Sequence, residues 1–344
     1  MKNRILVLAM AGIALVSCGG RANGGSVDSS VSSEQSDSGA SSYDFKWVTP
    51  TGAPTLAFYD QGNNPNWVSA SNPSEIVVPS FAAKSYDAIV FDGVSGLNLM
   101  TKNPKAANYK LARWINNLGF YVVSVSHTKE EASAWNSDWT VNAFVESGNS
   151  SRAFVSLAAS VWNWSLGSGK ITYETGVSQV AANIPTNAYD FYVVADPVYT
   201  TLKGKMGDKL HLIYDLQEEW GKAHEGASIP SAALFVNSSL YSAHQADYNA
   251  FLRETDERID TLVENPSIAQ KSLEKYGASD ETAIVNGNYT KFGISESIIS
   301  NLANLQKSNV FGFLKSGTVT DKKAVADSFN EALGGSKFGD SLFL

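Results

Sequence analysis

The sequence predicts an α/β fold whose sheets are mostly parallel. Short apolar runs rich in β-branched and aromatic residues alternate with segments that carry helix signals, from residue 45 to residue 236. Such alternation builds parallel sheets, because each helix returns the chain to the edge where the next strand begins. About 300 residues follow Tyr43, and a single hydrophobic core rarely reaches that size, so two domains are expected.

The first third of the chain opens with an alternating run at 45–49, which predicts a strand. Pro54 suits the first turn of a helix that extends to 61, since its fixed φ and missing N–H donor fit that position. A second short strand is predicted at 76–78. A third, at 86–91, is closed by Asp92-Gly93 and followed by a helix near 96–102.

The middle third repeats this order, and the last third is predicted to be helical. Strands are expected at 119–125, 140–145, 171–173, 189–195, 210–214 and 232–236, and helices at about 151–164, 177–182 and 198–203. Beyond residue 240, helices are expected at 241–264, 266–276, 296–306 and 323–333.

The N-terminus has the pattern of an export signal. Lys2 and Arg4 precede an apolar stretch at 5–16, which is shorter than the roughly 20 residues a membrane-spanning helix needs. Cys18 is the only cysteine, and Leu15-Val16-Ser17 before it resembles the lipobox of bacterial lipoproteins. The resemblance implies that 1–17 are removed and that Cys18 carries diacylglycerol, whose two chains hold a protein on a membrane. The alternative is an ordinary signal peptide with a chance cysteine.

The segment 18–42 is expected to be a flexible linker behind that lipid. Residues 19–42 are rich in Gly and Ser and contain no aromatic side chain, so they cannot bury enough surface to order themselves. The formal net charge of −8 and the absence of a basic run argue against a nucleic-acid partner. The four histidines lack the spacing of a zinc site, so no metal and no cofactor is expected.

Several segments, in order, resemble the type II periplasmic binding proteins, the solute receptors of bacterial ABC importers. They are TPTGAPTLAF (49–58), YDAIVFDGVSGLNLM (86–100), YDFYVVADPVYTTL (189–202) and the stretch from DLQEEW (215–220) to IPSAALFVN (229–237). Within that family, the segments look most similar to the nitrate, sulfonate and thiamine-precursor receptors. The resemblance covers most of the chain beyond the linker.

This resemblance implies a two-lobed fold with mixed, mostly parallel sheets and a two-strand hinge. Lobe 1 would comprise 43–120 plus 236–344, lobe 2 would comprise 121–235, and the crossing strands would lie at 119–126 and 232–237. A small solute would bind between the lobes. The partners implied are an ABC permease and its ATPase, with a monomeric receptor on the outer face of the cell membrane and no enzymatic activity.

The candidate binding residues follow predicted strands, because ligands of parallel sheets lie at the carboxyl ends of the strands. Loops that lead into helices offer free N–H groups to an anion or a carbonyl, and an Asp could accept hydrogen bonds from a ligand amine. Helix capping is the alternative role for the Asp and Ser residues. Trp114 is the best candidate for stacking on a flat ligand. The candidates are Thr51, Gly52, Ala53, Asp92, Gly93, Trp114, Ser147, Gly148, Asn149, Ser150 and Asp196.

Two other classes of function remain open. Chorismate dehydratase-like enzymes and thiamine-pyrimidine synthases share the fold, but they work in the cytoplasm, and the lipobox argues against them. A tethered sensor that presents its ligand to another receptor is the third possibility.

Overall fold

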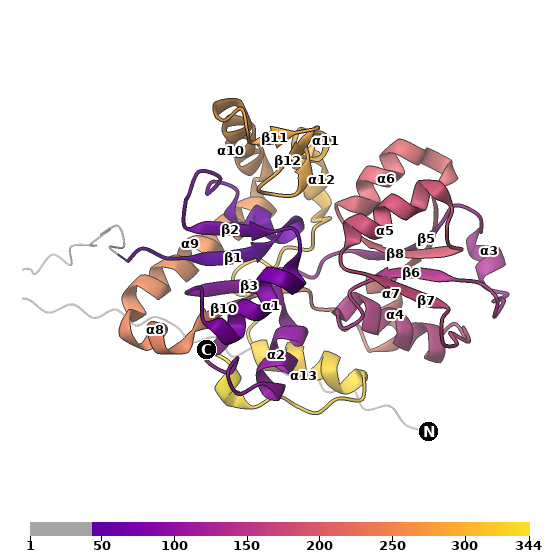
Figure 1. The fold of residues 1–344 in the computed structure, drawn as a ribbon, viewed down its shortest axis with the longest axis horizontal. Helices are drawn as coiled ribbons and strands as arrows, with labels where there is room; N and C mark the ends of the chain where they lie inside the picture. Colours follow the sequence, from indigo (N-terminus) through magenta and orange to yellow (C-terminus); the bar gives the residue numbers. More distant parts are fainter. Residues whose placement is uncertain (1–42) are drawn as a thin grey trace, which may run out of the picture. The chain divides into compact units, whose positions relative to one another are not determined.

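Two five-stranded α/β sheets dominate the structure (Figure 1). This computed structural model describes residues 43–344, which belong to one compact unit. The predicted signal peptide, Cys18 and the linker therefore lie outside the described residues. No helix within 43–344 is long and apolar enough to cross a bilayer.

The first sheet has the strand order β2-β1-β3-β10-β4. Its strands β1, β2 and β3 pair in parallel, and β10 pairs antiparallel with both β3 and β4. Four strands therefore run one way and β10 runs against them. The strands are β1 (Trp47–Pro50), β2 (Trp67–Ala70), β3 (Ala88–Asp92), β4 (Tyr109–Trp114) and β10 (Ala232–Asn237).

The second sheet, β7-β6-β8-β5-β9, repeats this arrangement. Strand β6 pairs in parallel with β7 and β8, and β5 runs antiparallel between β8 and β9. In each sheet the odd strand is therefore the one that enters from the other sheet. The strands are β5 (Phe120–Ser124), β6 (Val141–Phe144), β7 (Ile171–Glu174), β8 (Phe191–Ala195) and β9 (His211–Asp215).

Helices follow most strands, as the α/β prediction required. In Figure 1, α5 and α6 cover one face of the second sheet, and α4 and α7 cover the other. The longer helices are α1 (Pro73–Ala83), α2 (Gly93–Lys102), α4 (Asn149–Ser160), α5 (Val177–Asn183), α6 (Val198–Met206), α7 (Leu216–Ala223), α9 (Gln245–Glu264), α10 (Pro266–Ser279) and α13 (Lys322–Ala332). The shorter ones are η1 (Ala53–Phe58), α3 (Lys129–Ala132), η2 (Ile184–Thr186), η3 (Gly207–Lys209), α8 (Ser238–Ala243), α11 (Glu296–Ile299), α12 (Leu302–Leu305), η4 (Gln306–Ser308) and η5 (Asp340–Leu342).

Two predictions of secondary structure were wrong. The run at 76–78 is not a strand but part of α1, because Pro73 occupies the first turn and Val77 and Phe81, four residues apart, bury one helical face. The second strand is instead β2. The last third is also not entirely helical, since β11 (Ile284–Val285), β12 (Asn288–Tyr289) and β13 (Ile294–Ser295) form a small antiparallel sheet.

Aromatic side chains fill the cores beside both sheets. Trp47 and Trp67 stack with their centroids 6.4 Å apart against the first sheet. Beside the second sheet, Trp135 stacks on Trp164 at 4.4 Å. Rings bury large apolar areas, which explains why most of the aromatic residues serve as core.

The chain passes between the sheets twice, at 115–119 and at 224–231. The predicted crossing ranges, 119–126 and 232–237, coincide with β5 and β10, each directly after a passage. Asn116 joins the two passages: its Oδ1 accepts from Ala232 N at 3.1 Å, and its backbone O accepts from Ser231 N at 3.1 Å. The fully buried Asn116 therefore holds the crossing segments together.

Candidate functional site

The carboxyl ends of β3 and β6 meet at one point between the two sheets. Asp92 ends β3 and caps α2, because its Oδ1 accepts a hydrogen bond from Ser95 N at 2.9 Å. Its Oδ2 accepts from Asn149 N, the first residue of α4, at 3.1 Å. Ser95 Oγ also donates to Ser147 O at 2.8 Å. The structure thus brings together two of the loops that sequence reasoning selected.

The Asp92 carboxylate lies in an environment that disfavours its charge. Burial raises its pKa from 3.8 to about 6, although the N–H groups of Ser95 and Asn149 and the positive charge of Arg152 act in the opposite direction. Desolvation is the largest of these effects. The pKa of a carboxylate that links both sheets is therefore raised to about 6.

The start of α4 is packed tightly around Asn149. Its Nδ2 donates to Pro230 O, in the second crossing passage, at 2.7 Å. Within the described residues, the buried Oδ1 of Asn149 has no hydrogen-bond partner. Gly148 and Ser150 are buried beside it. These residues form the N-terminus of α4 beside the second crossing passage.

The turn Thr51–Ala53 follows β1, as predicted, but the backbone N–H of Gly52 already donates a hydrogen bond within the protein. Gly52 has φ +102°, a conformation that favours glycine, and its N–H donates to Phe292 O at 2.7 Å. The segment 289–293 therefore covers this turn. Ligand contact by Thr51, Gly52 and Ala53 stays a prediction.

Trp114 and Gly93 pack against each other in the core of the first sheet. A Cβ on Gly93 would lie 2.1 Å from the Trp114 ring. Trp114 is 1% exposed, and its Nε1 donates to Lys322 O at 3.0 Å. Stacking of Trp114 on a ligand stays a prediction, and in this conformation the ring offers no exposed face.

Asp196 lies at the end of β8 with both carboxylate oxygens in use. Its Oδ1 accepts from Thr200 N at 3.2 Å and from Thr200 Oγ1 at 2.6 Å, which stabilises the start of α6. Its Oδ2 accepts from Tyr121 at 2.8 Å. Burial raises the pKa of Asp196. The capping role weighed for this residue is thus present, and no described hydrogen bond or ion pair joins Asp196 to the Asp92–Asn149 contact.

Sequence reasoning missed Arg152 and the segment 330–338. Arg152 lies in the first turn of α4, and its Nη2 donates to Asn330 Oδ1 at 3.3 Å. These residues help to line a cavity of about 640 Å³ beside Asp92 and Asn149. The basic residue directly after the predicted loop 147–150 was a usable signal, but nothing local indicated that α13 would lie opposite it.

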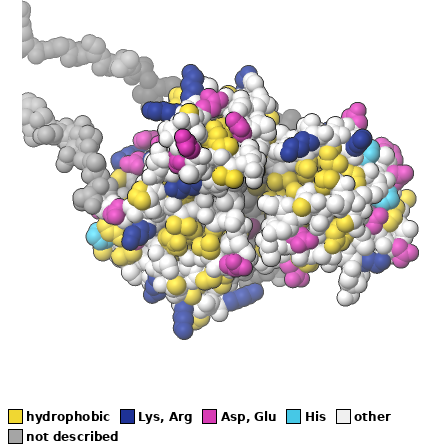
Figure 2. Space-filling model, turned by 45° about the horizontal axis from the view of Figure 1, so that its top comes forward, with side chains coloured by type: hydrophobic (Ala, Val, Ile, Leu, Met, Phe, Trp, Pro, Cys, Tyr) yellow, Lys and Arg dark blue, Asp and Glu magenta, His cyan; other side chains and the backbone are white. Residues whose placement is uncertain are grey.

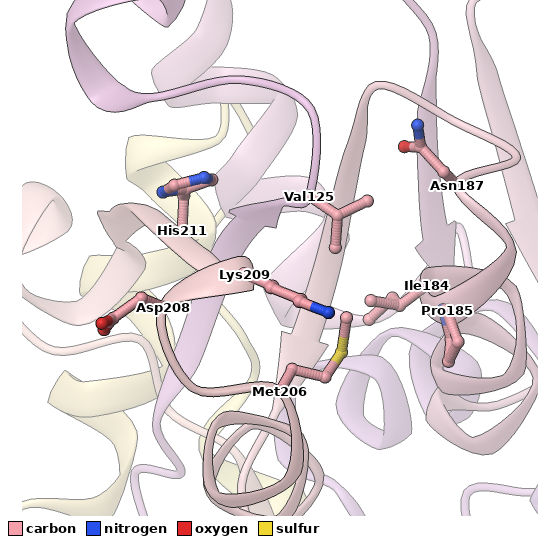
Figure 3. Close-up of a pocket in the computed structure, with 8 residues that line it drawn as sticks. All are labelled: Val125, Ile184, Pro185, Asn187, Met206, Asp208, Lys209 and His211. Atoms are coloured by element: carbon pink, nitrogen blue, oxygen red, sulfur yellow. The ribbon is translucent and has the colours of Figure 1, made fainter.

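Another cavity, of about 790 Å³, lies at the opposite edge of the second sheet (Figure 3). Figure 3 shows Met206 and Lys209 directed toward Ile184, whereas Asp208 points away. Because this cavity lies at the amino end of β9, it is not at the ligand-binding edge of the sheet. Residues 43–344 contain no cluster of His, Asp and Glu arranged to hold a metal ion. On the face shown in Figure 2, acidic and basic side chains are interspersed.

No protein-family model and no curated protein matches the sequence. Solved structures do match the fold. An ABC transporter protein from Parabacteroides distasonis is 15% identical, with a TM-score of 0.59 over 87% of this chain and 98% of that one. The zinc-bound ligand-binding component of an ABC-type import system from Staphylococcus aureus is 11% identical, with a TM-score of 0.62; the match covers 87% of this chain and 96% of that one. The periplasmic nitrate-binding protein NrtA from Synechocystis PCC 6803 is 10% identical, with a TM-score of 0.58; the match covers 84% of this chain and 80% of that one.

These likenesses, together with the two matching sheets, define the class of fold. The chain has the two-lobed α/β fold of the periplasmic solute-binding proteins of ABC importers. The predicted fold class is confirmed.

Proposed function

We propose that this chain is the extracytoplasmic solute-binding component of an ABC importer. One observation carries the proposal: two sheets of identical strand order, joined by two crossing segments, have their ligand-binding edges in contact through Asp92 and Asn149. Such an arrangement suits a protein that closes around a small molecule and opens by rotation about its crossings. The likeness to solved import receptors supports the same function.

In this proposal the lobes are 43–120 plus 236–344 and 121–235, with the solute between them. The N-terminus of α4 is a site for an acceptor group, because its free N–H groups and dipole favour negative charge. Asp92 takes that position in the present conformation. A solute with an anionic or carbonyl group would replace the carboxylate there, and the closed receptor would then dock on a permease.

A screen of solutes tests the proposal directly. Sulfonates, nitrate, thiamine pyrimidines, riboflavin and amino acids are added to the purified protein, and thermal unfolding is followed for each. We expect one class to raise the melting temperature and to change the small-angle scattering curve toward a more compact particle. Chemical conversion of the bound compound, followed by mass spectrometry, would instead indicate an enzyme on this fold. If no compound binds and the scattering curve never changes, the proposal is wrong.

The proposal includes a lipid anchor at Cys18. The export signal, the lipobox-like residues before Cys18 and the Gly/Ser-rich linker support it. We expect Cys18→Ala to move the protein from the membrane fraction to the soluble fraction, whereas Ser26→Ala in the linker leaves it on the membrane. Sedimentation of the Cys18→Ala variant with membranes would exclude the anchor and leave the solute-binding role intact.

A further inference from the structure

The cavity beside the Asp92–Asn149 contact is built from both sides of the crossing. Helix α2 supplies Ser95 and Lys102, the start of α4 supplies Ser147 and Arg152, and the segment 330–338 after and within α13 closes it. Its volume of about 640 Å³ falls in the usual range for small-molecule sites, roughly 300–1,000 Å³.

The charged residues that line this cavity are all basic. They are Lys102, Arg152 and Lys337, and no Asp or Glu is among the lining residues. This is notable in a chain whose formal net charge is −8. Among the described residues Lys102 and Arg152 make no ion pair, whereas Lys337 Nζ pairs with Glu331 Oε1 at 3.9 Å. The charge of Arg152 also interacts with that of Asp92, which lies beside the cavity. The lining itself therefore carries three cations and no acid.

Arg152 is the best-placed cation. It is half-buried, and the only described hydrogen bond of its side chain runs from Nη2 to Asn330 Oδ1, a neutral acceptor. Asn330 is itself oriented, because its Nδ2 donates to Ser336 O at 2.7 Å. Arginine has five N–H donors in a planar fork that matches an oxyanion. The Arg152 side chain is thus held in place with most of its donors available.

Apolar side chains also line the cavity. Phe91 and Leu99 from the β3–α2 region and Leu333 and Phe338 from the C-terminal segment contribute to the lining. An occupant that satisfies both kinds of lining carries a charged oxyanion and a hydrocarbon body. Inorganic anions such as nitrate would leave the apolar side chains uncovered.

We propose that this cavity binds an organic anion with an apolar body and that Arg152 binds its charged end. The inference rests on the proposed function and names the substrate class of that receptor. Because Arg152 belongs to α4 whereas the apolar lining residues belong to the β3–α2 region and the C-terminal segment, the occupant bridges the two lobes. Its binding therefore favours the closed conformation that a permease would recognise.

The experiment measures binding by calorimetry to the full chain. The probes are hexanesulfonate, hexyl phosphate and hexanoate, with hexanol and hexylammonium as uncharged and cationic counterparts. We expect at least one of the three anions to bind, and both counterparts to bind at least 10-fold more weakly. Arg152→Gln should weaken anion binding about 10-fold or more, since a charge-assisted hydrogen bond is lost.

Three further variants keep the test decisive. Arg253→Gln removes an exposed arginine from α9 and should leave the affinity unchanged. Arg152→Lys keeps the charge without the fork and should recover part of the loss. Lys102→Glu reverses an exposed charge in the last turn of α2 and should weaken binding several-fold.

The outcomes separate this inference from the proposed function. If an anion binds and neither Arg152→Gln nor Lys102→Glu changes its affinity, the inference is wrong and the receptor role stands. Equal binding of hexanol or hexylammonium also overturns it, as does the absence of heat with all three anions. The receptor role is judged separately, by the wider solute screen and by the scattering change.

Discussion

The Asp92 carboxylate should make the stability of the protein depend on pH between about 4 and 6.5. Burial raises its pKa from 3.8 to about 6, so the folded protein binds this proton more tightly than the unfolded chain does. A group whose pKa is raised on folding stabilises the protein below the unfolded pKa. That stabilisation is lost as the pH rises through the folded value.

The size of the effect follows from the same two values. The rise from 3.8 to about 6 corresponds to at most about 3 kcal/mol, at about 1.4 kcal/mol for each tenfold change in proton affinity. This is a large part of the 5–15 kcal/mol typical of a folded protein. The pKa of about 6 already includes the hydrogen bonds that Asp92 accepts from two N–H groups. The expected loss of stability is therefore the part of the burial cost that these bonds do not offset.

The assay compares wild-type protein with Asp92→Asn by urea unfolding from pH 4 to pH 7.5. We expect the wild type to lose up to about 3 kcal/mol relative to the Asn variant as the pH rises, with a plateau above about pH 7. Asp208→Asn, which removes an exposed carboxylate, controls for the change in net charge. A difference that is independent of pH, or one that grows in favour of the wild type with rising pH, would refute the burial argument.

Two further predictions concern stability. Gly93→Ala should lower the free energy of unfolding by about 1–3 kcal/mol, because its Cβ would meet the Trp114 ring. Gly204→Ala is the control: its Cβ in α6 would meet nothing within 4 Å, so the change should be neutral or stabilising. If urea unfolding shows equal effects for both glycine changes, the close packing of Gly93 against Trp114 is contradicted. Asn116→Ala should cost about 1–3 kcal/mol, because it removes the side-chain partners of two buried backbone groups, Ala232 N and Phe311 O. Thermal unfolding beside an Asn288→Ala control at an exposed position measures this, and a melting temperature equal to that of the control would show that Asn116 does not hold the crossing.

Local sequence predicted the parts of the site that depend on strand ends. Asp92 and the loop 147–150 were selected because each follows a buried strand, and the carboxyl ends of parallel strands collect at one edge. The structure places them in contact. Strand direction and the turn into a helix are encoded within a few residues, whereas the sheet order determines which strand ends meet. Ligand contact by these residues stays a prediction.

Local sequence gave the wrong secondary structure where the burial of side chains determines whether a segment is a helix or a strand. The β-branched run at 76–78 favours a strand by composition, yet it lies in α1, where Val77 and Phe81 are buried on one side and Pro73 begins the helix. Tertiary packing outweighs an intrinsic preference of less than about 1 kcal/mol per residue. The small sheet β11–β13 was missed for a related reason, since strands of two residues leave no periodicity to detect.

The basic cavity could not be predicted from sequence because its parts are far apart along the chain. Arg152 and Asn330 are 178 residues apart, and neither belongs to a motif. Their proximity depends on the position of α13, which the sequence analysis predicted only as a helix. Pairing across such distances is a property of the assembled fold.

Asp92 and the cavity together suggest why a receptor of this kind would need its solute to close. Near neutral pH the folded protein holds the ionised Asp92 carboxylate in a poorly solvated position, at a cost of up to about 3 kcal/mol relative to the unfolded chain. In the proposed receptor, opening would return this carboxylate to water and break its hydrogen bond with Asn149 N, so only the part of the cost that this bond does not offset opposes closure without solute. An organic anion held by Arg152 adds apolar contacts and charge-assisted hydrogen bonds on both lobes, and these favour closure. The balance between the two terms would therefore keep the receptor open until its solute arrives.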